Sequence, residues 1–321
     1  MEVLEKIFNI ALIAATLRTT APILLVALGG TFTTKAGIFN IGLEGQMLTG
    51  AFFAVLGSIW TGSAMGGLAI GVSAAIVMAA IFSLLVVTFR ANEVVVGLAL
   101  NIMAGGLTIT LSKAIFGTRG SIVRNDIVGL PRVDIPFISD LGPIGRVLSG
   151  YTPLVYCAFI FVFVVWLILY RTRLGLHIRV VGEKPDAAES LGISTDRMQH
   201  IASLMCGLLA GLAGAHLSLG YITMFAENMS SGRGFMAVAV LIFSNGDPVK
   251  VLLGCLLFGF SDALSLRLQS FGLSSYLVLM VPYLVSLTAL FILTYRQRPK
   301  VIRETLESLS LIRRPERPSE P

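Results

Sequence analysis

Two apolar stretches interrupted by glycine contain the polar side chains best placed to do chemistry in this chain. The first, residues 36–47 with the sequence AGIFNIGLEGQM, carries Asn40, Glu44 and Gln46. The second, residues 230–243 with the sequence SSGRGFMAVAVLIF, has Arg233 between two glycines. Glycines that break a helix free backbone groups, which must line a cavity or pack against protein because lipid cannot bond them. Close packing of neighbouring helices through glycine is the alternative.

Glu44 is the most informative of these residues. A carboxylate at bilayer depth costs about 2.5–3.5 kcal/mol on insertion scales, so such a group faces protein or water. Glu44 could line a solute pathway, or it could accept hydrogen bonds from backbone N–H groups that the break frees. A solvated position at the membrane interface is the third possibility. Asn101, in the apolar stretch 94–111, could likewise face a pathway or bond a neighbouring helix.

The sequence lacks the motifs of common enzyme and metal sites. It has no GxxxxGK[ST] phosphate loop and no GxSxG elbow. Its 3 histidines and 3 cysteines are too scattered for a metal site. Charged residues within the apolar stretches are few and dispersed, which argues against a proton or sodium relay. We therefore predict that the chain is not an enzyme and binds no cofactor or metal itself.

Membrane-spanning helices are the elements predicted to hold these polar residues. Hydrophobic residues make up 55% of the chain and charged residues 13%, against about 25% charged in soluble domains. Apolar runs of about 18 or more residues recur. The sequence thus predicts an all-α polytopic membrane protein with eight to ten transmembrane helices in two related halves and Gly-broken helices near the midplane. Much of the net charge of +6 lies after Tyr295, so we expect no nucleic-acid binding.

Nine apolar stretches are candidate spans. They cover residues 7–33, 38–60, 64–89, 94–111, 153–170, 200–219, 235–245, 249–266 and 275–295. The first is interrupted by Arg18 and Pro22 and could form one tilted helix or two pieces. The seventh is too short to cross a bilayer of about 30 Å as an ordinary helix.

A charged island, RTRLGLHIRVVGEKPDAAESLG at residues 171–192, stands between two apolar halves and predicts a compact helix. Pro185 suits the first helical position, Asp186 and Glu189 favour the positive helix start, and Gly192 can end the helix. Three small or apolar residues would form one face of it, Ala187, Ala188 and Leu191. The island is thus suited to binding a partner, and an ordinary solvated loop helix is the alternative.

The charges and the number of membrane crossings predict the side of the membrane on which each loop lies. Four crossings between the island and the basic tail at 296–321 would place both on one face, which is cytoplasmic if the tail obeys the positive-inside rule. The loop 112–152 would then be external. We therefore predict one transmembrane domain, 1–295, with a cytoplasmic coupling loop at 171–198 and a disordered cytoplasmic tail.

Four motifs together resemble a known family. They are AGIFNIGLEGQM, NEVVVGLALN at 92–101, RLGLHIRVVGEKPDAAESLGIS at 173–194 and SGRGFMAVAVLIF. The chain resembles bacterial ABC-importer permeases of the simple-sugar and branched-chain amino-acid group, and is most similar to nucleoside-type members. The resemblance covers about residues 19–295. It implies a multi-pass protein of the bacterial cell (inner) membrane that carries nucleosides, driven by a separate ATP-binding subunit with ATP and Mg²⁺.

The resemblance also implies partners and functional residues. The partners are an ATP-binding subunit, a second related permease and an extracytoplasmic substrate-binding protein, with a small molecule as substrate. The coupling helix comprises Gly182, Glu183, Pro185, Asp186, Ala187, Ala188, Leu191 and Gly192. A pathway for a neutral solute would be lined by Asn40, Glu44, Gln46, Asn101 and Ser231.

Alternatives to the nucleoside importer stay open. A simple-sugar permease differs in substrate alone, but sugar permeases carry an Ile-Asp pair where this chain has Phe39 and Asn40, which favours nucleosides. An ion-coupled secondary transporter would need a membrane carboxylate, for which Glu44 and Asp262 are the candidates. A structural membrane subunit would show no dependence on substrate.

Overall fold

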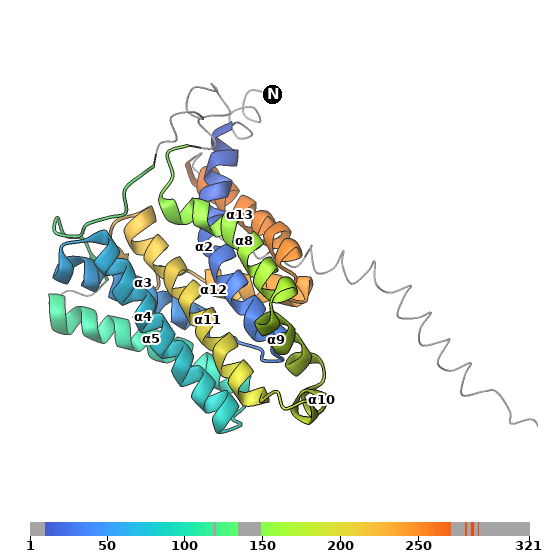
Figure 1. Ribbon diagram of the computed structural model, residues 1–321. Coiled ribbons are helices and arrows are strands. Elements are labelled where there is room, and N and C mark those ends of the chain that lie inside the picture. The colour runs from blue at the N-terminus through green and yellow to red at the C-terminus, as the bar shows by residue number, and fades with distance from the viewer. Residues whose placement is uncertain are drawn as a thin grey trace, which may run out of the picture.

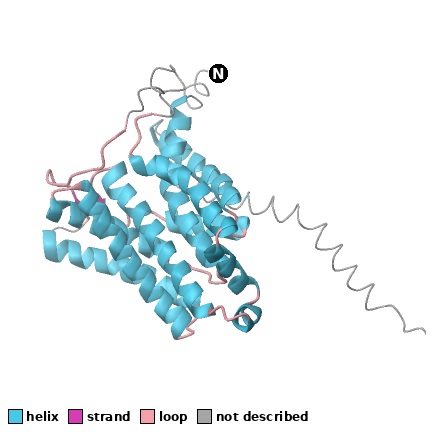
Figure 2. Ribbon diagram, in the orientation of Figure 1, coloured by secondary structure: helices cyan, strands magenta, loops and turns pink. Residues whose placement is uncertain are grey.

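The computed structural model describes residues 10–117, 120–133 and 149–270, with single positions at 280, 284, 285 and 288. This part of the chain is a bundle of helices with one two-stranded sheet (Figures 1 and 2). The long elements are α2 Ile10–Lys35, α3 Leu43–Thr61, α4 Ala64–Ser83, α5 Glu93–Phe116, α8 Pro153–Arg171, α11 Thr195–Ala215 and α13 Pro248–Ser270. The short ones are the π-helices η1 Leu84–Thr88 and η2 His216–Tyr221, the helices α9 Arg173–Glu183, α10 Pro185–Ser190 and α12 Arg233–Ser244, and the strands β1 Ser121–Ile122 and β2 Phe225–Ala226.

Helix α2 forms the centre of the bundle. Every residue from Thr19 to Thr33 is buried, because α3, α8, α11, α12 and α13 all pack against this helix. The helix is continuous through Pro22, so the first apolar stretch is one helix and not two pieces. Thr16 and Thr31 donate their hydroxyls to carbonyls of the preceding turn, at 2.8 and 3.0 Å. These bonds give the two hydroxyls hydrogen-bond partners, which neither lipid nor an apolar core could provide.

Within the part of the chain that the structure describes, six helical segments are long and apolar enough to cross a membrane. They are Ile10–Lys35, Ala64–Thr88, Glu93–Phe116, Pro153–Arg171, Thr195–Tyr221 and Pro248–Gln269. The protein is therefore a multi-pass membrane protein. The seventh apolar stretch forms α12, whose 12 residues are too few to cross, as its length predicts. The predicted span 275–295 and the tail 296–321 lie outside the described residues.

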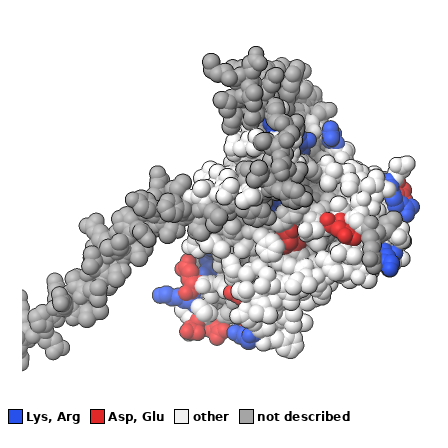
Figure 3. Space-filling model, turned by 180° about the vertical axis from the view of Figure 1, so that it is seen from behind, with Lys and Arg blue, Asp and Glu red and all other residues white. Residues whose placement is uncertain are grey.

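The predicted coupling loop, 171–198, and the described part of the 112–152 loop lie at opposite ends of the bundle (Figure 1). Helix α9 meets the C-terminal end of α2, where Gly182 lies against Lys35. At the far end of α3, Ser58 exchanges hydrogen bonds with Val128, each at 2.9 Å. Here β1 pairs antiparallel with β2, Ser121 opposite Ala226. On the face drawn in Figure 3 the Lys and Arg side chains keep to the margins, and much of the surface between them is uncharged.

Candidate functional site

The first helix break lies between α2 and α3, and side chains from two other helices, α5 and α11, brace it. The break comprises residues 36–42, between Lys35 and Leu43. Gln199 of α11 donates to the carbonyl of Ala36 at 3.2 Å, and Glu93 of α5 accepts from the N–H of Phe39 at 2.7 Å. Buried backbone groups outside a helix need such partners. The glycine-rich sequence therefore forms a real break with an ordered path.

Asn40 and Asn101 bond the backbone where α3 begins. The Asn40 Oδ1 accepts from the N–H of Gly42 at 2.9 Å. The Asn101 Oδ1 accepts from the N–H of Gly45 at 2.7 Å, and its Nδ2 donates to the carbonyl of Ile41 at 2.9 Å. Of the two interpretations of Asn101, the structure shows the bond to a neighbouring helix. Asn92, the N-cap of α5, accepts from the N–H groups of Val94 and Val95.

Replacing Asn101 by leucine is expected to destabilise the folded protein by about 3 kcal/mol, because it leaves a buried N–H and a buried carbonyl unpaired at about 1–3 kcal/mol each. Thermal melting of the purified protein in detergent measures the effect. The control is Thr110→Val on the same helix, since the exposed Thr110 hydroxyl bonds only its own helix, at Gly106. Equal melting temperatures for the two variants would show that the break does not depend on Asn101.

Glu44 joins the first break to the second. Its side chain is 6% exposed, and its Oε1 and Oε2 accept from the N–H groups of Gly232 and Gly234 at 2.8 and 2.6 Å. Gly232 is the N-cap of α12, so the carboxylate lies on the positive end of that helix. Hydrogen bonds to a charged group contribute about 1.5–3 kcal/mol each. Of the three roles open to Glu44, bonding freed backbone N–H groups is the one that the structure shows.

The two helix starts are in direct backbone contact. A Cβ atom on Gly234 would lie 2.5 Å from the backbone N of Glu44 and 2.7 Å from its Oε2. On the other side of α3, a Cβ on Gly45 would lie 2.9 Å from the carbonyl oxygen of Leu100. Real side chains do not approach so closely, and only glycine fits at either position. The glycines thus have both of the roles considered from the sequence: they lie at helix breaks, and they let neighbouring helices pack closely.

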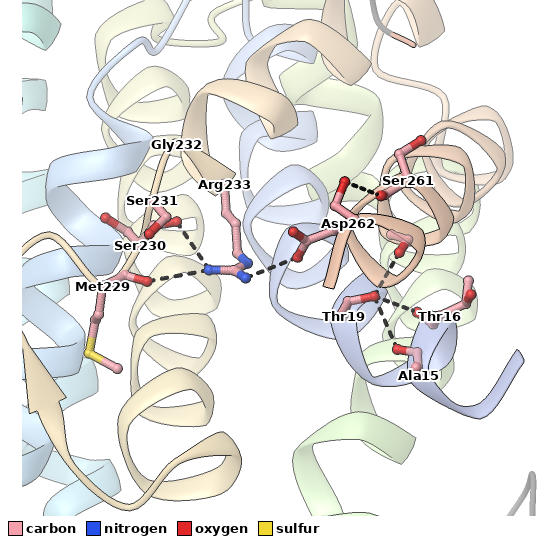
Figure 4. Close-up of polar contacts among 12 residues, drawn as sticks. Ala15, Thr16, Thr19, Met229, Ser230, Ser231, Gly232, Arg233, Ser261 and Asp262 are labelled. Atoms are coloured by element: carbon pink, nitrogen blue, oxygen red, sulfur yellow. Dashed lines mark hydrogen bonds and ion pairs between the residues drawn. The ribbon is translucent and has the colours of Figure 1, made fainter. Parts of the chain in front are cut away.

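Arg233 and Asp262 form an ion pair on the other side of the second break (Figure 4). The Arg233 Nη2 donates to the Asp262 Oδ2 at 2.9 Å, and its Nη1 bonds the carbonyl of Met229 at 3.3 Å. The two side chains are 14% and 16% exposed. Desolvation of this kind makes a broken pair costly, about 3–5 kcal/mol when one partner is removed. Asp262, named above as a candidate carboxylate of an ion-coupled transporter, is thus paired with Arg233.

The remaining candidates for a pathway lining are divided between core and surface. Gln46 and Asn40 are both buried against the Cys206 thiol. The Gln46 Oε1 accepts from this thiol at 3.7 Å, and the Asn40 Nδ2 donates to its sulfur at 3.5 Å. Ser231 is exposed, in the short segment before α12. Asn40, Glu44 and Gln46 therefore belong to the core in this conformation. Arg233, Asp262 and Glu93 carry bonds at the breaks that the sequence analysis did not assign to them.

Helix α10 has the predicted ends. Pro185 is its first residue, and Gly192 follows it with φ of +78°, a left-handed conformation that favours glycine. The N–H of Ile193 bonds the carbonyl of Ala188 and that of Gly192 bonds Glu189, at 3.0 and 2.9 Å, which is the pattern of a glycine helix stop. The sequence of the island thus specifies the helix.

The predicted apolar face of α10 is not one surface. Ala188 is 0% exposed and packs into the protein, whereas Leu191 is 76% exposed and Ala187 is also exposed. On a helix the three positions fall within one arc of about 100°, so the division reflects how α10 packs: only the side of that arc that carries Ala188 meets the rest of the chain. A partner could therefore contact Ala187 and Leu191 while Ala188 fixes α10 to the rest of the chain.

The scan of protein families matches residues 12–290 to a family described as "Branched-chain amino acid transport system / permease component". The chain belongs to this permease family. It is 35% identical to the guanosine ABC transporter permease protein NupQ of Bacillus subtilis, over 87% of this chain and 90% of the relative. It is 32% identical to the nucleoside ABC transporter permease protein NupC of Lactococcus lactis, over 79% and 81%. It is also 35% identical to the Haloferax volcanii permease protein TsgC13, to which glucose transport is ascribed provisionally, over 83% and 80%.

Membership establishes the chain as a permease component of an ABC transporter and agrees with the resemblance drawn from the four motifs. Residues 12–290 include both breaks and the loop 171–198. Among the residues that the structure describes, no group of three or more His, Cys, Asp or Glu side chains could hold a metal ion.

Proposed function

We propose that this permease carries nucleosides into a bacterial cell across the cell membrane. The observation that carries the proposal is its similarity, over most of both chains, to guanosine and nucleoside permeases from two bacteria, at 35% and 32% identity. A simple sugar is the second candidate, because TsgC13 is also 35% identical. Either solute is neutral, which suits a membrane segment with few charges.

The proposed transporter has at least three subunits besides this chain. A separate ATP-binding subunit, with ATP and Mg²⁺, would bind the loop 171–198 on the cytoplasmic side, and a second, related permease would pair with this chain. The curated relatives support a pair of different permeases, since Bacillus subtilis has NupP, 29% identical to this chain, as well as NupQ. An extracytoplasmic binding protein would deliver substrate at the end where the 112–152 loop lies.

The proposed pathway runs beside the second break. In this chain Asn228 and Ser231 are exposed immediately before α12, where the glycine-rich segment leaves the regular helix pattern. Exposed irregular backbone inside a membrane must face protein or water. We infer that it faces the pathway or the paired permease. The full chain would have eight to ten crossings in two related halves within residues 1–295, and ATP-driven rocking would open the pathway to each side in turn.

Uptake of radiolabelled guanosine and ribose tests the proposal. Cells lacking the chain are compared with cells in which it has been restored. Restored uptake of guanosine with unchanged uptake of ribose is the expected result. The reverse pattern would assign the chain to simple sugars, and restoration of neither by the full set of subunits would contradict both candidates.

A further inference from the structure

We propose that Glu44 is a positioning residue that makes α12 follow the coupling loop, so that its carboxylate sets how much substrate moves per ATP hydrolysed. The proposal rests on the proposed function as an ATP-driven importer. It names the residue contacts through which movement of the coupling loop would reach α12. It depends on three consecutive contacts: α9 on the first break, the bracing of that break, and the two bonds from Glu44 to α12.

The first contact joins the coupling loop to the first break without an intervening side chain. A Cβ on Gly182, in the last turn of α9, would overlap the carbonyl oxygen of Lys35 and would lie 2.8 Å from the backbone N of Gly37. Two backbones in van der Waals contact cannot approach further, and close-packed elements transmit displacement. A push on α9 toward the bundle therefore reaches Gly37 directly.

The second step is the stiffness of the break itself. Between Gly37 and Glu44 the chain is held by Glu93 at Phe39 and by Asn101 at Ile41, while Asn40 bonds Gly42 within the segment. A loop with its backbone groups bonded at successive positions resists bending more than a solvated loop does. Displacement at Gly37 is thus carried to the start of α3 and to Glu44.

The third contact passes the displacement to α12. Among the hydrogen bonds of the described chain, those from Glu44 to Gly232 and Gly234 are the ones that join α3 to the start of α12. The same first turn is tied to α13 by the pair Arg233–Asp262 (Figure 4). The start of α12 therefore has polar attachments to two helices, α3 and α13, while α12 as a whole also packs against α2. Without the carboxylate of Glu44, α12 would stay with α13 when α3 moves.

The test uses the complete transporter, with both permeases and the ATPase, in liposomes with its binding protein. Uptake and substrate-stimulated ATP hydrolysis are measured together for wild type and Glu44→Gln, which keeps the shape but loses the charge and one acceptor oxygen. We expect uptake to fall about tenfold and hydrolysis to fall less than about twofold, so that ATP used per substrate rises at least about fivefold, within the usual range of coupling between sites.

The control variant is Thr110→Val. The exposed Thr110 hydroxyl bonds the carbonyl of Gly106 in its own helix and takes no part in the three contacts. Its loss is expected to leave the ratio of ATP to substrate unchanged. If Glu44→Gln does not assemble, Glu44→Asp serves instead, because the shorter side chain cannot span both N–H groups and should raise the ratio to a smaller extent.

Parallel loss of uptake and hydrolysis, with the wild-type ratio, would show that Glu44 only stabilises the fold and would overturn the proposal. This outcome is distinct from failure of the proposed substrate. If wild type transports ribose and not guanosine, the nucleoside assignment fails, and the same ratio is measured with ribose.

Discussion

Replacing Gly234 by alanine is expected to abolish transport. The added Cβ would lie 2.5 Å from the backbone N and 2.6 Å from the Cα of Glu44, so the starts of α3 and α12 must separate. Separation breaks both bonds to the Glu44 carboxylate, at about 1.5–3 kcal/mol each, in addition to the cost of overpacking. We expect a loss of about 4 kcal/mol or more in the free energy of unfolding, and uptake below about a tenth of wild type.

The control for Gly234→Ala is Gly106→Ala in α5. A Cβ on Gly106 would meet no atom of the described residues within 4 Å beyond its chain neighbours and the nearby backbone of its own helix, and alanine is favoured over glycine inside a helix by about 0.5–1 kcal/mol. Thermal melting and the elution of the detergent-solubilised protein in size exclusion compare the two. If Gly234→Ala and Gly106→Ala have the same melting temperature, the close contact of the two helix starts does not limit stability.

A charged residue at position 191 is expected to separate transport from ATP hydrolysis while the fold stays intact. Leu191 is 76% exposed at the end of α10, so Leu191→Glu costs the isolated chain little. In the proposed complex it would place a charge in the contact with the ATPase, and we expect uptake to fall by more than about tenfold through loss of a docking residue. Copurification of the ATPase with the permease measures binding directly.

The matched variant is Ala188→Glu, one turn earlier on the same helix. Ala188 is 0% exposed, so a carboxylate there is buried without a partner and should destabilise α10 itself. Limited proteolysis of the loop distinguishes the two effects, with faster cleavage expected for Ala188→Glu alone. If Leu191→Glu binds the ATPase and takes up substrate as well as wild type does, the proposal that α10 is the docking helix is wrong.

Local chemistry explains why several elements were predicted well from sequence. Hydropathy depends on composition along the chain, so the long apolar runs marked the helices that form spans. The ends of α10 were also predictable, because Pro185 and Gly192 act through their own backbone conformations. The family resemblance, drawn from four motifs between residues 36 and 243, was confirmed by the family match over residues 12–290.

The partners of polar side chains were less predictable. Glu44 and Gly234 are 190 residues apart, and no local pattern states that the carboxylate of one bonds the backbone of the other. Arg233 and Asp262 were visible as charges in apolar surroundings, but their pairing depends on how α12 packs on α13. The division of Ala188 from Ala187 and Leu191 likewise depends on which side of α10 meets the bundle.

The sequence by itself determined a multi-pass helical protein with two glycine-rich breaks and a capped loop helix, since hydropathy, glycine and proline act over a few residues, and its four motifs carried the resemblance to permeases. Only the tertiary structure decided that the two breaks meet and that Glu44 bonds the start of α12. That outcome follows from packing, because glycine at positions 45 and 234 lets three helices approach closely enough for one buried carboxylate to satisfy two backbone N–H groups.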